Sequence, residues 1–169
     1  MKIKKPNTKY VVVRKSKVHG RGVFAKKDIK KGTKIIEYVG EIVSKEEGDK
    51  RSEEQLKAHK NNPEKGAVYI YDLTTKYDLD GDVPNNPAKF INHSCSPNCK
   101  YKCEGLKIWI VAKKDIKKGE ELNYNYGYDD EDFQDHPCCC KSQNCIGYIV
   151  GSHYKRFVLK RLRMKNNKH

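Results

Sequence analysis

Residues 90–99, with the sequence FINHSCSPNC, bring amide, imidazole, hydroxyl and thiol groups into ten consecutive positions. Pro97 excludes the interior of a helix or of a central strand, so we expect a loop, and loops held by a rigid scaffold often carry function. Two further groups of reactive side chains follow, namely the aromatic run at residues 123–128 and the cysteine cluster at residues 138–145. The sequence therefore predicts a site where this loop meets tyrosines and thiols.

The cysteine cluster is typical of a metal site. Structural zinc takes four Cys or His ligands in a tetrahedron. Cys138, Cys140 and Cys145 lie close enough in the sequence to supply three ligands, and the fourth must come from elsewhere. Cys139 is an additional thiol that leaves the assignment of the ligands open.

Tyrosine is the dominant aromatic residue, with eleven against four Phe and one Trp. Tyr124 and Tyr126 share one face of an extended segment. Tyr38 and Tyr101 would join them if two hairpins and the central loop converge, and the result would be a narrow channel lined with phenols. Such a channel suits a lysine side chain, because its alkyl stem packs on rings and its ammonium is attracted to ring faces. The alternative is an aromatic core whose hydroxyls are all hydrogen-bonded.

These motifs resemble those of SET-domain protein-lysine methyltransferases. Residues 92–98 (NHSCSPN) resemble the core motif of that family, and residues 119–127 (GEELNYNYG) resemble the second motif. Residues 19–25 (HGRGVFA) and 37–41 (EYVGE) resemble its N-terminal signature. The cysteine cluster resembles the short post-SET zinc segment. Five motifs in family order cover most of the chain, from about residue 11 to about residue 147.

The resemblance implies transfer of a methyl group from S-adenosyl-L-methionine to a lysine Nζ of a protein. It implies that Tyr126 lies beside the reacting atoms and that Tyr38 and Tyr101 line the lysine channel. Tyr124 occupies the family's phenylalanine-or-tyrosine switch position, where a tyrosine leaves less room and favours monomethylation. Asn125 stands where many relatives carry aspartate, which affects fine tuning rather than the reaction.

The resemblance also assigns the ligands of the cofactor and of zinc. The cofactor would be held by Gly20, Arg21, Gly22, Tyr69, Asn92, His93 and Tyr126. Zinc would be held by Cys95, Cys138, Cys140 and Cys145. Of these, Asn92 is the firmer cofactor ligand, because in this family the histidine helps to fasten a pseudoknot.

We predict a β-rich α+β fold of the SET-domain type, with small sheets around a pseudoknot. Four segments are expected: a basic N-terminal arm (1–9), a SET domain (10–130), a post-SET zinc segment (131–150) and a basic C-terminal extension (151–169). A helical insert is expected at about 44–65, because Ser44 and Glu47 fit a capping box. Gly48 is expected to weaken this helix.

Two other patterns remain outside the motifs. Residues 25–32 (AKKDIKKG) recur letter for letter at 112–119, and each copy predicts a strand, a polar turn and a glycine with positive φ. The pair either delivers tyrosines to one place or forms two ordinary surface turns. In the tail, Tyr154, Phe157, Val158 and Leu162 fall near helical spacing. We expect a basic helix that docks on its own domain and leaves its Lys and Arg face free.

The net charge of +14 over 169 residues predicts an acidic partner or an acidic surrounding surface, such as nucleic acid or chromatin. Solubility alone is the plainer explanation. No apolar run approaches the ~20 residues of a membrane span, and the first residues lack the apolar stretch of a signal peptide. We therefore expect an intracellular protein without a membrane partner, nuclear in a eukaryotic host and otherwise cytoplasmic or exported as an effector.

We predict a lysine methyltransferase that acts on a histone or another basic chromatin-type protein and makes nonspecific contact with nucleic acid. One alternative is the same chemistry on a non-histone cytosolic or ribosomal protein. Another is a non-catalytic, zinc-containing module that binds nucleic acid, but it does not explain the paired tyrosines or the Asn-His loop. No oligomeric state is predicted.

Overall fold

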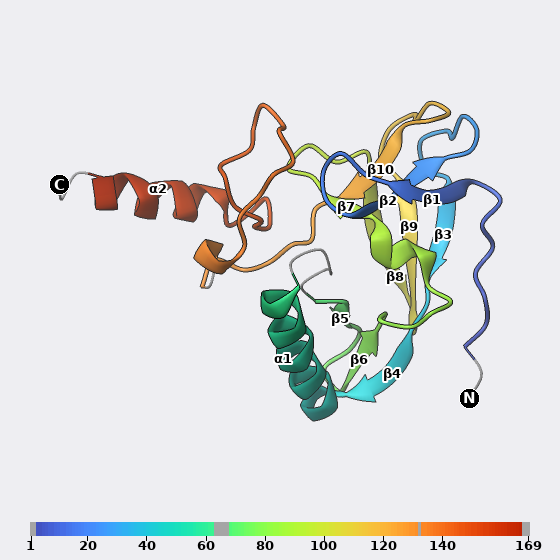
Figure 1. Ribbon diagram of the computed structural model, residues 1–169, viewed down its shortest axis with the longest axis horizontal. Coiled ribbons are helices and arrows are strands. Elements are labelled where there is room, and N and C mark those ends of the chain that lie inside the picture. Colours follow the sequence, from blue (N-terminus) through green and yellow to red (C-terminus); the bar gives the residue numbers. More distant parts are fainter. Residues whose placement is uncertain (1–2, 63–67, 132, 167–169) are drawn as a thin grey trace.

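The computed structural model describes residues 3–62, 68–131 and 133–166, which form three small sheets and two α-helices (Figure 1). The first sheet has the order β1 (Val11–Lys15), β2 (Arg21–Ala25), β10 (Glu121–Tyr124), β7 (Asn92–His93). The second has the order β3 (Lys34–Tyr38), β9 (Lys107–Ala112), β8 (Cys99–Glu104). The third has the order β4 (Glu41–Ser44), β6 (Tyr77–Asp80), β5 (Ile70–Asp72). The expected β-rich fold with few helices is confirmed.

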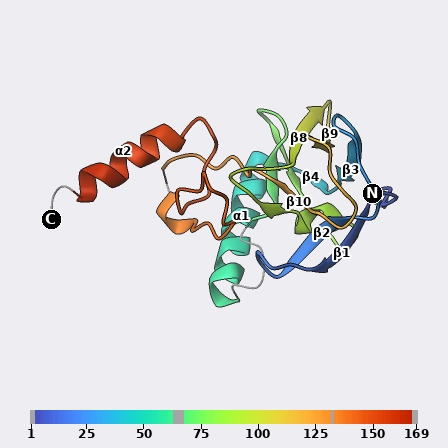
Figure 2. The same cartoon turned by 90° about the horizontal axis from the view of Figure 1, so that it is seen from above.

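The core lies where the first two sheets meet. Its fully buried side chains include Val23 of β2, Ile36 of β3, Ile108 and Ile110 of β9, and Leu122 of β10. β-branched side chains favour strands, and each buried aliphatic side chain contributes about 1.5–3 kcal/mol. Seen from above, the sheets gather at one end of the molecule while α2 projects from the other (Figure 2).

The central loop is fastened to β10. β7 pairs with β10 in parallel, with His93 opposite Tyr124. The side chains of Asn98 and Asn123 then accept from each other's backbone N–H, at 2.9 and 3.1 Å. Because both asparagines replace backbone partners in a partly buried place, they fix the loop after β7 beside the strand that carries Tyr124.

Helix α1 (Lys45–Asn61) begins as the sequence predicts, since the Ser44 hydroxyl accepts a hydrogen bond from the Glu47 N–H at 3.3 Å. Residues 63–65 of the expected insert lie outside the described residues. The helix is held to β6 by buried carboxylates: Lys45 Nζ lies 2.5 Å from Asp78 Oδ1, and Arg51 Nη1 lies 2.9 Å from Asp80 Oδ2. Pairing compensates the cost of burying these two charges.

Gly48 allows α1 to pack closely against Asp78 of β6. It is buried, and a Cβ added there would overlap Asp78 Oδ2 and lie 3.1 Å from Asp78 Cβ. Only glycine lets the helix approach β6 this closely.

A second, smaller core joins the C-terminal elements. Phe133 of the 3-10 turn η2 (Phe133–Asp135), Val150 and Val158 of α2 (Lys155–Asn166) are its buried members. The expected docking of the basic helix therefore occurs through Val158, with Tyr154 and Leu162 partly buried beside it. Phe157 does not join, and 59% of it is exposed, because it lies about 100° around the helix from Val158.

Across the described part of the chain, neither helix combines the length and the apolar character that a bilayer crossing requires.

We expect Gly48→Ala to destabilise the protein by about 1–3 kcal/mol, the usual cost of overpacking a close contact. In an open helix the same change would stabilise by roughly 1 kcal/mol. Urea unfolding followed by circular dichroism measures the difference. Ser52→Ala on the same helix is the control and should have little effect. A Gly48→Ala protein as stable as the control would show that α1 does not need this contact.

Candidate active site and metal centre

The tyrosines that the sequence singled out lie in one cluster of rings. Tyr124 at the end of β10 contacts Tyr126, with ring centroids 5.0 Å apart, and lies 6.4 Å from Tyr101 of β8. Tyr38 of β3 joins through Tyr71 of β5, at 4.8 Å. Tyr71 in turn lies 5.5 Å from Tyr101. Strands from all three sheets thus deliver phenol rings to one place.

The cluster changes from exposed to buried. Tyr101 is 44% exposed, whereas Tyr124 is 7% and Tyr38 only 2% exposed. The hydroxyl of Tyr38 donates to the Tyr69 carbonyl, and that of Tyr126 donates to the Ile91 carbonyl, both at 3.1 Å. Because each donor is committed to the backbone, the orientation of these phenols is fixed. The cluster therefore combines one exposed ring, Tyr101, with buried or half-buried rings of fixed orientation.

Burial raises the pKa of Tyr38 and Tyr126 well above the usual value, and the neighbouring phenol of Tyr124 raises both further. The pKa of Tyr128, whose ring lies 5.9 Å from that of Tyr126, rises to about 12 for the same reason. The rings therefore stay neutral at physiological pH. They offer π faces and hydroxyl dipoles but no negative charge.

Tyr71 belongs to this cluster and was missed by the sequence reasoning. Its ring stacks near that of Tyr124, at 6.2 Å and 29°, and its buried hydroxyl has no hydrogen-bond partner of good geometry among the described residues. A buried, unpaired hydroxyl is costly and invites a functional explanation. The available signal was its period-two spacing from Tyr69 on the same extended segment.

The loop expected to cradle a cofactor is tied to the central motif. Gly20 adopts φ +44°, and Asn92 Nδ2 donates to the Arg21 carbonyl at 3.1 Å and to Glu121 Oε1 at 2.8 Å. A Cβ at Gly22 would overlap that same carboxylate. The Asn92 amide nitrogen therefore holds the loop in place, and any cofactor contact would fall to other atoms of Asn92.

The side chain of Arg21 turns elsewhere, with its guanidinium 3.7 Å above the Phe90 ring. Tyr69, another of the predicted cofactor residues, is half-buried, and its carbonyl accepts a hydrogen bond from the hydroxyl of Tyr38. Its backbone N–H donates to Gln55 of α1 at 2.8 Å. The insert helix thus helps to position one wall of the tyrosine cluster.

His93 connects the tyrosine cluster to the cysteines. Its Nδ1 accepts from the Tyr126 N–H at 3.2 Å, and its Nε2 lies 3.4 Å from Cys95 Sγ. Burial lowers the pKa of His93 to about 4, so the imidazole is neutral. These contacts make His93 a fastening between two segments.

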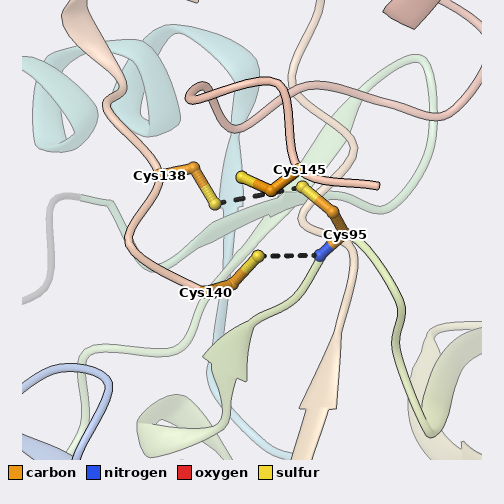
Figure 3. Close-up of side chains that lie close together, drawn as sticks. All are labelled: Cys95, Cys138, Cys140 and Cys145. Carbon is orange, nitrogen blue, oxygen red and sulfur yellow. Dashed lines mark hydrogen bonds between the residues drawn. The ribbon is translucent and has the colours of Figure 1, made fainter. Parts of the chain in front are cut away.

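Four cysteines converge behind this histidine: Cys95, Cys138, Cys140 and Cys145 (Figure 3). Their sulfur atoms all lie within 4.8 Å of one another, and those of Cys95 and Cys138 are 3.9 Å apart. Four sulfurs placed about 2.3 Å from a tetrahedral zinc ion would be separated by about 3.8 Å. The donor set and its spacing therefore fit Zn²⁺.

The pKa shifts of the clustered thiols indicate that a cation is needed to keep all four of them as thiolates. Burial raises the pKa of Cys95 to about 12. Burial also acts on Cys140, but hydrogen bonds from the Cys95 N–H and from Ser142 lower its pKa to about 6. Since zinc binds thiolates, a bound ion would supply the charge that stabilises the others. Cys139 is exposed and lies outside the four.

The SET domain family model matches residues 20–127, which is more than half of the sequence. The chain belongs to the SET domain family. The match spans the glycine loop, the central motif and the strand of Tyr124, that is, the three segments that build the site.

Several curated SET proteins are similar to the chain. Histone-lysine N-methyltransferase 2D of Homo sapiens is 36% identical over 140 residues, which cover 80% of this chain and 2% of that protein. The variant-silencing SET domain-containing protein of Plasmodium falciparum is 39% identical over 152 residues, which cover 86% of this chain and 6% of that protein. The H3 lysine-4 specific histone-lysine N-methyltransferase of Schizosaccharomyces pombe is 36% identical over 138 residues, covering 79% and 14%. The chain thus spans a small part of the length of these relatives.

SET methyltransferases use S-adenosyl-L-methionine. The rings of Tyr69 and Tyr126 are only half-buried, and aromatic faces attract a sulfonium cation. The glycine loop is held beside β7 by Asn92. The residues present therefore fit this cofactor.

We expect the purified protein to contain about one zinc ion per chain, because the four sulfurs fit a tetrahedral site. Cys140→Ser should lose most of this metal and melt at a lower temperature, whereas Cys139→Ser should retain both. Elemental analysis and differential scanning fluorimetry measure the two effects. Equal metal loss in both variants, or metal-free wild-type protein, would contradict the assignment.

Proposed function

We propose that this chain is an S-adenosyl-L-methionine-dependent protein-lysine N-methyltransferase that mainly monomethylates. The observation that carries the proposal is the tyrosine cluster, which runs from exposed Tyr101 through half-buried Tyr126 to buried Tyr124 and Tyr38. When bound, the cofactor supplies the methyl group. The protein's own residues then have to admit, desolvate and aim one lysine side chain.

The channel suits the protonation state that the reaction requires. The lysine must lose its proton so that the lone pair of Nζ is free, and with a usual pKa of ~10.4 this costs about 4–5 kcal/mol at pH 7. Removal from water lowers the pKa of an amine. The phenols of Tyr38 and Tyr126 stay neutral, so they do not stabilise an ammonium by ion pairing.

Positioning supplies the other contribution. The Tyr126 hydroxyl is fixed by the Ile91 carbonyl, and its backbone is fixed by His93. A rigid wall beside the amine restricts it to few orientations, and alignment of reacting groups lowers a barrier substantially. We assign Tyr126 to contact with the reacting atoms, and Tyr38 and Tyr101 to contact with the lysine stem.

The preference for one methyl group rests on Tyr124. This residue is buried, and its ring lies between those of Tyr126 and Tyr71. A hydroxyl at the closed end of the channel occupies space that additional methyl groups on Nζ would need.

A histone or another basic protein is the proposed substrate, and nuclear chromatin is the proposed location. Relatives named histone-lysine N-methyltransferases support this choice. A non-histone basic protein remains the alternative and shares the chemistry. The cluster of oriented tyrosines favours an enzyme over a zinc-containing module that only binds nucleic acid.

We expect the wild-type protein to add one labelled methyl group to a lysine of core histones. Tyr126→Phe should lower kcat by at least tenfold, about 1.4 kcal/mol, because the oriented hydroxyl is lost. Mass spectrometry after incubation with isotope-labelled S-adenosyl-L-methionine measures both.

Tyr77→Phe is the matched control, since this tyrosine is 47% exposed on β6 and outside the cluster. No label on histones or on a basic non-histone protein, together with no thermal stabilisation by the cofactor, would refute the enzyme. Stabilisation without label would refute only the choice of substrate.

Tyr124→Phe should raise the yield of dimethyl- and trimethyl-lysine over monomethyl-lysine by about tenfold or more, equal to roughly 1.4 kcal/mol of relieved crowding. The same mass spectra give the ratio. Tyr71→Phe is a comparison that removes a hydroxyl from the neighbouring ring. An unchanged ratio in Tyr124→Phe would show that this position does not set the product.

A further inference from the structure

The internal repeat folds into two turns that lie side by side, apart from the site. One turn, residues 26–33, joins β2 to β3, and the other, residues 113–120, joins β9 to β10. Both lie at the upper right in Figure 1, in light blue and light orange. They sit at the opposite end of β2 from the glycine loop, and this strand of five residues spans about 16 Å.

The two turns are related by a local two-fold axis, because each bond of one recurs in the other. Ile29 and Ile116 exchange both backbone hydrogen bonds, at 2.8 and 2.9 Å. Asp28 accepts from the Lys118 N–H, and Asp115 accepts from the Lys31 N–H, each at 2.9 Å.

The glycines that end the turns complete the symmetry. Gly32 and Gly119 have φ of +84° and +87°. Gly32 N–H donates to the Ala112 carbonyl at 2.9 Å, and Gly119 N–H donates to the Ala25 carbonyl at 2.8 Å. The repeated sequence therefore builds one symmetric, doubly braced platform rather than two separate loops.

Its outer surface consists of lysines. Eight of them face solvent, against two aspartates and Glu120, which leaves a net charge of +5: Lys26, Lys27, Lys30, Lys31, Lys113, Lys114, Lys117 and Lys118. Lys30 pairs with Asp115, and Lys117 with Asp28. The other six form no ion pair within the described residues. Holding so many like charges together is unfavourable unless an anion neutralises them.

We propose that this lysine platform binds the phosphate backbone of double-stranded DNA without reading its sequence. Lysine acts as a point charge toward phosphates, and phosphate contacts position a protein without specifying bases. The surface has the two-fold symmetry that two antiparallel backbones also have. This contact goes beyond the proposed methyl transfer and does not depend on it.

Other acidic partners fit less well. Proteins that bind single strands use exposed aromatic rings on which bases stack, and neither turn carries an aromatic residue. Protein interfaces need apolar anchors at their centre, whereas Ile29 and Ile116 are 2% and 1% exposed. A rigid, positively charged surface without exposed aromatic or apolar side chains therefore favours the phosphate backbone of a duplex over a single strand or a protein.

The experiment measures binding of the full chain to a 30-base-pair duplex of arbitrary sequence by fluorescence anisotropy between 50 and 200 mM salt. The variant replaces the symmetric pairs Lys27 and Lys114, and Lys31 and Lys118, by glutamine. Because each phosphate contact contributes about −0.9 to the slope of log K against log salt, we expect the slope of the variant to be less steep by about 3–4. The affinity at 100 mM salt should fall at least tenfold.

The control removes the same charge elsewhere, by replacing Lys50, Lys57 and Lys60 of α1 and Lys76 of the β5–β6 turn with glutamine. It should bind within about twofold of the wild-type protein. Equal losses in both variants would assign binding to net charge alone and overturn the proposal. So would a wild-type protein that prefers single-stranded DNA or polyglutamate to the duplex.

Methylation of a short lysine peptide should be unchanged in the platform variant, because the four lysines lie away from the tyrosine cluster. This second readout also shows that the variant is folded. A loss of peptide methylation would overturn the separation of the two surfaces.

Discussion

The hydrogen bonds between the central loop and β10 are the constraint on which the rest of the structure depends. Asn98 and Asn123 bind each other's backbone, and Asn92 reaches across to the glycine loop. His93 adds a bond to the Tyr126 N–H. These side chains do what a longer strand pairing would otherwise do. They let an irregular segment stay buried while it touches the tyrosine cluster, the glycine loop and the cysteines.

Sequence reasoning placed most of this correctly where a local rule applies. The Ser44 cap follows from capping chemistry, and three of the four clustered cysteines follow from ligand type and spacing, whereas Cys95 was implied by the family resemblance. Tyr38, Tyr101, Tyr124 and Tyr126 were expected together, and their rings do lie in one cluster. Their roles in catalysis stay predictions.

The rest could not be read from local patterns because it depends on which elements meet in space. Tyr71 joins the cluster only because β5 is the outer strand of the third sheet. Gly48 looked like a weak point of its helix, yet its role comes from Asp78, thirty residues later. Phe157 was expected in the docked stripe, but the second core buries Val158, which leaves Phe157 about 100° around the helix and exposed. Strand β8 was missed, since its alternating lysines conceal its pairing with β9.

The cysteine cluster also imposes an order on folding. Cys95 and Cys138 are separated by 43 positions, and closing a loop of that length costs roughly 3 kcal/mol of chain entropy. The pairing of β10 with β7 already places Tyr124 beside His93, so only the 14 positions from Tyr124 to Cys138 remain to be closed and the sheets meet part of this cost. Metal capture is then a local event that completes the fold. The segment that carries Cys138, Cys140 and Cys145 therefore becomes ordered after the tyrosine cluster is assembled, and the protein without zinc would keep that cluster while this segment stays loose.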